Sequence, residues 1–178
     1  MAQFQSLPFL WLLSDARNDA VLEDRLRALP PGSGFVYRHY DLAPQERIAR
    51  FMALRQIARA RGHLVILADS TLTAREWGAD GVYGAARSLY PTRGDMVTVA
   101  TAHDMAEIAQ ANRARADAVM LSPVFPTNSH PGAPTLGPVR FRQLARHARM
   151  PVIALGGMDA HRAKALRWPR WAAIDGLS

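Results

Sequence analysis

Residues 117–178 decide the fold, and they open with DAVMLSPVFPTN (117–128) and later contain MPVIALGGM (150–158). Each segment holds a short apolar run, at residues 118–121 and 152–155. Runs of this length beside Pro and Gly are typical of buried parallel strands. Because a helical pattern follows each run, the stretch predicts two consecutive strand–helix units.

The ends of these two strands predict a phosphate site. Gly156 and Gly157 let the backbone approach a ligand closely, and the next helix points its N–H groups at an anion. In a βα barrel, phosphate binds in the loops after strands seven and eight. Ser122, Thr127 and Ser129 follow the earlier strand and offer hydroxyl groups. The alternatives are a tight turn without a ligand and an ordinary polar loop.

The same alternation of strands and helices extends over the whole chain and predicts a parallel α/β fold. Strands are expected at residues 9–13, 34–40, 64–68, 81–83, 96–100, 118–121, 152–155 and 172–174. Inward helix positions are expected at Ile48, Phe51, Met52, Ile57, Met105, Ile108, Ala109, Phe141, Leu144 and Ala145. Eight units in 178 residues indicate one domain, residues 1–178, a small (β/α)8 TIM barrel with trimmed helices. The helix after strand four is expected to be short or missing, because little sequence separates Tyr83 from Met96.

Composition narrows the class of protein. The net charge is +7, with Lys164 as the only lysine and the arginines scattered along the chain. Without a basic run or interleaved aromatic residues, we expect no nucleic-acid partner. No apolar run reaches the ~20 residues of a membrane span, no signal peptide is apparent, and there is no cysteine. A cytoplasmic protein is expected.

Two end-of-strand residues have competing interpretations. Arg38 follows the second strand, where a guanidinium clamps phosphate or forms a salt bridge with Asp15 or Asp69. Asp69 follows the third strand, where it is either a metal ligand or a helix N-cap, with nearby threonines as rival caps.

The chain resembles the thiamin phosphate synthase and thiazole tautomerase family. SPVFPTNSH (122–130), Leu136-Gly137 and PVIALGGM (151–158) resemble the family pattern G-P-[VI]-F-x-T-x-[TS]-K, LG and P-V-x-A-I-G-G-[IM]. The resemblance spans nearly the whole chain, and its last third is the specific part. It implies transfer of a pyrimidine from its pyrophosphate to thiazole phosphate, assisted by Mg²⁺.

The resemblance assigns catalytic positions to Arg38, Asp69 and His130, with Asp69 as a weak metal candidate. It also exposes departures: Tyr40 and His130 replace two lysines, and Ser88 stands where a second Asp belongs. The Mg²⁺ requirement is therefore doubtful, because a hard cation prefers anionic oxygen. Pro123 occupies the position of the tautomerase's His.

Three functions stay open at this point: a diverged synthase, a thiazole-phosphate-binding tautomerase-like or regulatory protein, and a non-catalytic interaction module. A sugar-phosphate isomerase or epimerase also fits the glycines alone. The sequence leaves the oligomeric state undetermined.

Overall fold

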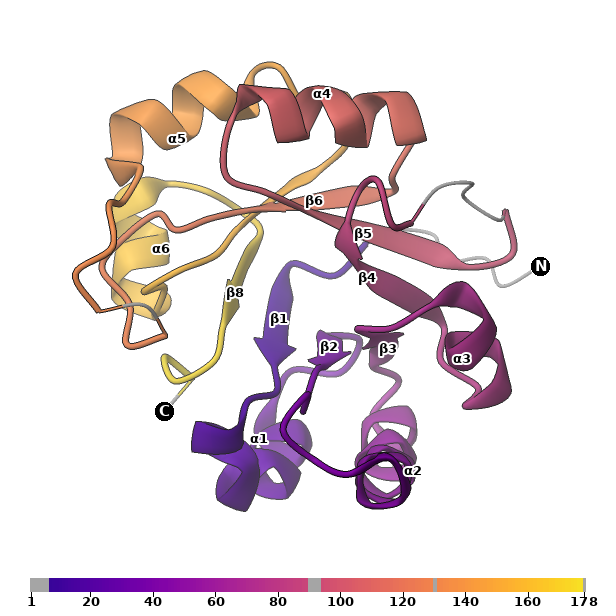
Figure 1. Ribbon diagram of the computed structural model, residues 1–178. Coiled ribbons are helices and arrows are strands. Elements are labelled where there is room, and N and C mark those ends of the chain that lie inside the picture. Colours follow the sequence, from indigo (N-terminus) through magenta and orange to yellow (C-terminus); the bar gives the residue numbers. More distant parts are fainter. Residues whose placement is uncertain (1–6, 90–93, 130, 178) are drawn as a thin grey trace.

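The computed structural model describes residues 7–89, 94–129 and 131–177 as a closed barrel of eight parallel strands (Figure 1). In chain order they are β1 (Leu10–Leu13), β2 (Gly34–Tyr37), β3 (Leu64–Leu67), β4 (Gly81–Ala85), β5 (Val97–Ala102), β6 (Ala118–Leu121), β7 (Val152–Ala154) and β8 (Trp171–Ala173). Each strand pairs with the next, and β8 closes on β1 with Trp11 opposite Ala172. The predicted small barrel is confirmed.

Inside the barrel, the largest side chain lies opposite a glycine. Trp11 is fully buried and lies opposite Gly34 in the β1–β2 register. A Cβ atom on Gly34 would lie 2.1 Å from the Trp11 ring. The indole N–H donates to the Pro8 carbonyl at 2.9 Å, so this buried polar group is satisfied.

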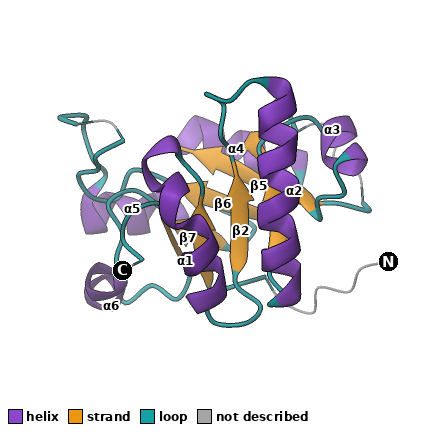
Figure 2. Cartoon of the chain, turned by 90° about the horizontal axis from the view of Figure 1, so that it is seen from below, coloured by secondary structure: helices purple, strands orange, loops and turns teal. Residues whose placement is uncertain are grey.

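Helices surround the strands, as the view from below shows (Figure 2). They are α1 (Leu22–Ala28), preceded by the 3-10 helix η1 (Ala16–Val21), then α2 (Pro44–Ala60), α3 (Thr71–Glu76), α4 (Met105–Ala114), α5 (Gly137–Ala145) and α6 (Ala160–Leu166). A hydrophobic cluster lies between these helices and the barrel. It includes Phe51, Ile108 and Phe141, as predicted.

Two inward assignments were wrong. Met52 and Met105 are 37% and 42% exposed. In α2 the buried face runs through Phe51, Leu54 and Ala58, which turns Met52 outward. Met105 is the first residue of α4, and the buried residues of this helix begin one turn later, at Ile108.

Between β4 and β5, the described residues form a turn and contain no helix. The Ala85 carbonyl accepts from the amide and the hydroxyl of Ser88, at 2.9 and 2.8 Å. The predicted loss of the outer helix after strand four is confirmed for this described part.

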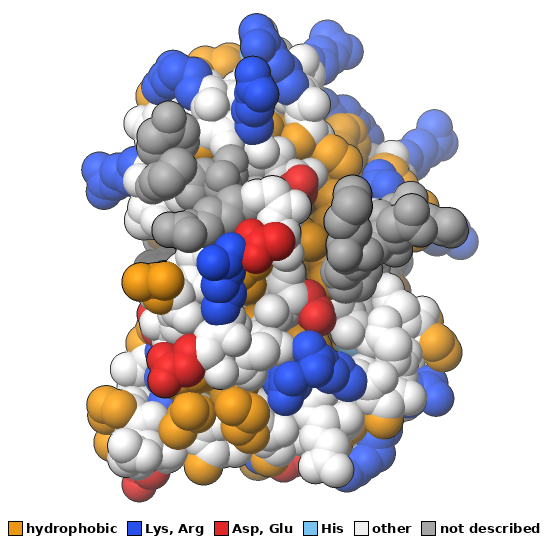
Figure 3. Space-filling view, turned by 90° about the vertical axis from the view of Figure 1, so that its right-hand side faces the viewer, with side chains coloured by type: hydrophobic (Ala, Val, Ile, Leu, Met, Phe, Trp, Pro, Cys, Tyr) orange, Lys and Arg blue, Asp and Glu red, His pale blue; other side chains and the backbone are white. Residues whose placement is uncertain are grey.

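On the face in Figure 3, basic side chains gather toward the top, and basic, acidic and hydrophobic side chains are interspersed below them. Among the residues described, no helix is long and apolar enough to cross a membrane.

Candidate functional site

A cavity of about 650 Å³ opens at the carboxyl ends of the strands, mainly between the loops after β6, β7 and β8. We call these the β6 loop (residues 122–129), the β7 loop (residues 155–159) and the β8 loop (residues 174–177). The five predicted phosphate-binding residues all line the cavity: Ser122, Thr127, Ser129, Gly156 and Gly157. Since βα barrels hold their active sites at this end, the cavity is the candidate site.

The two glycines are required by the packing of the β7 loop against the β6 loop. They have φ of +94° and +59°, values that non-glycine residues rarely adopt. A Cβ atom would lie 2.6 Å from the Pro123 Cα at Gly156, and 2.3 Å from the Pro126 carbonyl oxygen at Gly157. The Phe125 amide donates to the Gly156 carbonyl at 3.0 Å. A side chain at Gly157 would therefore disturb the loops as well as any bound phosphate.

This close packing leaves backbone donors beside the cavity. The amide of Gly157 donates to no backbone acceptor within residues 7–89, 94–129 and 131–177. The amide of Gly176 in the β8 loop also donates to no backbone acceptor among the described residues. Both glycines line the cavity. Free amides on adjacent loops are the donors that a phosphate oxygen needs.

Arg162 brings a positive charge to the same loops, and the sequence reading missed it. Its guanidinium donates to the Gly157 carbonyl and lies 5.3 Å from the centre of the Phe125 ring. Asp159 caps α6 by accepting from the Arg162 amide at 2.7 Å, which fixes the backbone of this turn. The signal available in the sequence was an arginine in the first turn of the helix that follows the glycine pair.

The hydroxyls of the β6 loop are held by local and distant contacts. The Ser129 amide donates to Thr127 Oγ1 at 3.3 Å, and Ser129 Oγ accepts from Arg17 Nη2 at 2.7 Å. His130 lies outside the described residues, so its predicted catalytic role stays a prediction.

Arg38 forms the predicted salt bridge with Asp15, and its role as a phosphate clamp stays a prediction. Its Nη2 donates to Asp15 Oδ2 at 2.7 Å and its Nε to the Ser14 carbonyl at 2.8 Å, yet its side chain also lines the cavity. Burial acts to raise the pKa of Asp15, but hydrogen bonds from Arg17 and the charges of Arg17 and Arg38 lower it overall. The pair therefore stays charged, and Arg38 is held in place at the cavity wall.

The other end of the cavity carries an uncharged donor. Tyr83 lines the wall at the β4 end, and burial raises the pKa of its phenol to about 12. The phenol therefore stays protonated at neutral pH. His103 also lines the cavity, and its Nδ1 lies 2.8 Å from Glu107 on the first turn of α4.

Asp69 lies outside the residues that line the cavity. Its Oδ2 accepts from Arg47 Nη1 at 2.6 Å, and its Oδ1 accepts from the Ser70 amide at 2.7 Å. Burial acts to raise the pKa of Asp69, and the hydrogen bond from Arg47 with those from Ser70 and Thr73 lowers it overall. The predicted N-cap role is wrong, because Ser70 caps α3 by accepting from the Thr73 amide.

The described residues around Asp69 do not fit Mg²⁺. Within the described ranges, no three His, Asp or Glu side chains converge on one point. The Asp69 carboxylate is already paired with Arg47, and Ser88 donates its hydroxyl to a backbone carbonyl instead of offering a second carboxylate. Tyr40, where the resemblance expects a lysine, is 68% exposed.

The family is settled by comparison with known proteins. Residues 12–176 match the family model described as thiamine monophosphate synthase. The chain belongs to this family. A thiamine-phosphate synthase of Limosilactobacillus reuteri is 31% identical over 84% of this chain and 76% of its own length. One from Chloroflexus aurantiacus is 29% identical over 80% and 67%.

A solved structure shows the same fold. The thiamine phosphate pyrophosphorylase from Pyrococcus furiosus superposes with a TM-score of 0.76 at 21% identity, covering 93% of this chain and 84% of that one. At this identity the likeness concerns the fold alone.

Proposed function

We propose that this protein acts in thiamin biosynthesis by binding thiazole phosphate in the cavity between the β6, β7 and β8 loops. The observation that carries the proposal is the convergence there of the Gly157 amide, the Thr127 and Ser129 hydroxyls and the Arg162 guanidinium. These are donors for the phosphate oxygens, and the guanidinium also balances their charge.

The rest of the cavity suits the heterocycle of such a ligand. Its wall is part apolar, with Pro123, Leu155 and Ile174 among the lining residues. A phosphate at the β7 loop would place the ring toward Arg38 and Tyr83, which line the cavity from β2 and β4. Cavities that combine apolar walls with a few fixed polar groups are typical of small-molecule sites.

Synthase turnover is the second candidate, favoured by family membership and by Arg38 at the cavity wall. In that reaction the thiazole nitrogen forms a bond to the pyrimidine's methylene carbon as pyrophosphate leaves. We propose that this turnover is weak, because Asp69 is paired with Arg47 and no second carboxylate replaces the lost Asp at Ser88. A regulatory or tautomerase-like role is consistent with the same binding site.

Calorimetric titration with thiazole phosphate and with the unphosphorylated thiazole alcohol tests the proposal. We expect wild type to bind the phosphate at least tenfold more tightly, and Arg162→Ala to lose about tenfold in affinity, the equivalent of one charge-assisted hydrogen bond. Arg146→Ala is the matched control, because Arg146 is exposed at the far end of α5. Equal affinity of wild type for the two ligands would refute a phosphate site. Pyrimidine pyrophosphate, titrated with and without Mg²⁺, tests the second candidate.

A further inference from the structure

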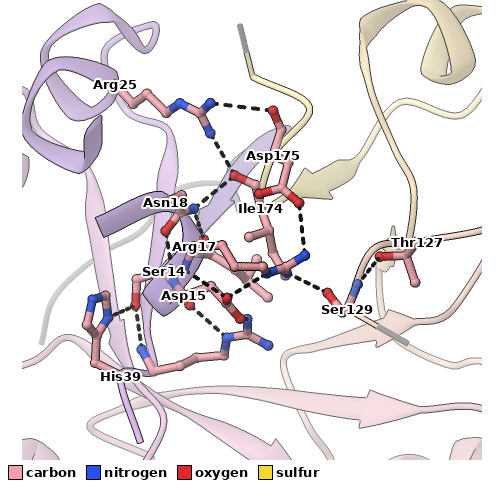
Figure 4. A network of polar contacts seen from close by, with 12 residues as sticks. Ser14, Asp15, Arg17, Asn18, Arg25, His39, Thr127, Ser129, Ile174 and Asp175 are labelled. Atoms are coloured by element: carbon pink, nitrogen blue, oxygen red, sulfur yellow. Dashed lines mark hydrogen bonds and ion pairs between the residues drawn. The ribbon is translucent and has the colours of Figure 1, made fainter. Parts of the chain in front are cut away.

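Arg17 joins three of the segments that surround the cavity. Its Nε donates to Asp15 Oδ1 at 2.8 Å, its Nη1 to Asp175 Oδ2 at 3.1 Å, and its Nη2 to Ser129 Oγ at 2.7 Å (Figure 4). Asp175 and Ser129 are 158 and 112 residues away in the sequence. One guanidinium on η1 therefore connects the end of β1 with the β6 and β8 loops.

The helix that carries Arg17 is itself firmly placed. Asp15 and Asn18 form a capping box around its first turn. Asn18 is 2% exposed, and its amide group donates to the Leu13 and Ile174 carbonyls at 3.0 and 2.9 Å. Arg25 Nη1 donates to the same Ile174 carbonyl at 2.7 Å. The β8 loop is thus fixed to the β1 segment through its backbone, and Arg17 adds contacts to side chains.

We propose that Arg17 is a positioning residue of the phosphate site, which holds the Ser129 hydroxyl and the β8 loop in the arrangement that binds the ligand's phosphate. This inference rests on the proposed function of the cavity. Arg17 itself is not among the lining residues, whereas Ser129 and Asp175 are. Its effect on the ligand therefore passes through these two partners.

A guanidinium is needed for this role because its donors form a rigid planar fork that reaches three acceptors together, whereas an ammonium is a compact point charge. The Arg17 and Asp175 side chains are 34% and 45% exposed. Ion pairs this exposed contribute little to global stability. The main consequence of losing Arg17 is therefore expected in ligand binding and in local loop order.

The first test compares Arg17→Met and Arg17→Lys with Arg27→Met. Arg27 is an exposed α1 arginine whose contact is an ion pair with Asp24 three residues earlier, so it controls for net charge. We expect Arg17→Met and Arg17→Lys each to weaken thiazole phosphate binding about tenfold, with Arg27→Met within about twofold of wild type. Wild-type affinity in Arg17→Lys would mean that charge alone matters and would overturn the positioning role.

A double-mutant cycle checks the route through Ser129. Ser129→Ala and Arg17→Met should together weaken binding less than the product of their separate effects, because both remove the same contact. Independent, multiplying effects would contradict the proposal. Equal losses for the phosphate and for the unphosphorylated alcohol would also contradict it, since they would indicate a general disturbance of the cavity.

Amide hydrogen exchange separates this inference from the proposed function. Without ligand, Arg17→Met should accelerate exchange in residues 127–129 and 174–177 severalfold, and Arg27→Met should not. If wild type fails to bind thiazole phosphate, the proposed function fails and Arg17 loses its assigned role, even where exchange accelerates. If wild type binds and Arg17→Met changes neither exchange nor affinity, only the inference about Arg17 fails.

Discussion

The two sides of the barrel's carboxyl end use their polar residues in opposite ways. On the side of β6 to β8, glycines bring the loops together and leave amides and hydroxyls around a cavity. On the side of β2 and β3, the chain fills the space with its own ion pair. Arg47 donates to Asp69 and to the Arg38 and Ala68 carbonyls, and its side chain is 12% exposed.

Aromatic rings complete the filled side. The Arg47 guanidinium lies 5.9, 5.7 and 5.4 Å from the ring centres of Tyr37, Tyr40 and Trp77, distances at which a cation is attracted to a ring face. Asp69 ends a strand but already has an internal partner in Arg47, so its position at the strand end does not by itself indicate a binding site.

The largest expected effect concerns the open side, where Gly156→Ala should lower the free energy of unfolding by about 3 kcal/mol through overpacking and backbone strain. Gly132→Ala is the control, because Gly132 also has positive φ but nothing lies within 4 Å of its added Cβ. Strain alone should cost about 1 kcal/mol there. Urea denaturation measures both, and equal losses would show that the contact with Pro123 is unimportant.

On the filled side, Arg47→Met should destabilise the fold by about 2 kcal/mol, because it leaves the half-buried Asp69 without its partner. Arg59→Met, which removes a longer 3.4 Å pair with Asp80 at a more exposed position, should cost about 0.5 kcal/mol or less. Thiazole phosphate affinity should stay within about twofold of wild type in both variants. A large loss of affinity in Arg47→Met alone would show that both sides of the barrel end contribute to one binding site.

Restoring the family pattern sharpens the comparison further. The triple variant Tyr40→Lys, Ser88→Asp and His130→Lys should raise Mg²⁺-dependent synthase turnover about tenfold, equivalent to about 1.4 kcal/mol in the barrier. Wild-type turnover should be weak and higher at pH 6 than at pH 8. The reason is that a histidine imidazole, such as that of His130, has a reference pKa of about 6.5 and gains positive charge at the lower pH. Robust wild-type turnover at pH 8 would show that synthase chemistry in this protein does not depend on the family residues at these three positions.

The smallest effect concerns acid stability at the boundary between the two sides. The pKa of Asp15 is lowered in the folded protein, so its stabilisation is present above its unfolded pKa of about 3.8 and is lost as pH falls through the folded value. Asp15→Asn keeps a cap acceptor and removes the charge. It should cost about 1 kcal/mol at pH 7, and the cost should shrink as the pH falls below about 3.8 and through the folded pKa. Asp24→Asn, at an 89% exposed side chain, should change stability at neither pH.

Individual residues show which structural features the local sequence pattern predicts and which it does not. Residues 118–121 were predicted with the observed bounds of β6, because an apolar run between turn residues is a local signal. The cavity-lining positions of Gly156 and Ser129 followed from their places after strands in a barrel. The inward assignment of Met52 failed because the rotation of a helix on the barrel depends on all its contacts.

By itself, the sequence determined the eightfold alternation, the closed barrel and the side of the barrel on which phosphate-binding residues gather. These features depend on hydrophobic periodicity, on chain length and on the positions of glycines, all of which can be read along the linear sequence. Tertiary structure alone decided that Arg47 pairs with Asp69 and that Arg17 reaches Ser129 and Asp175. Long arginine side chains select partners by distance in space, and partners 22 to 158 positions apart become neighbours only in the folded chain.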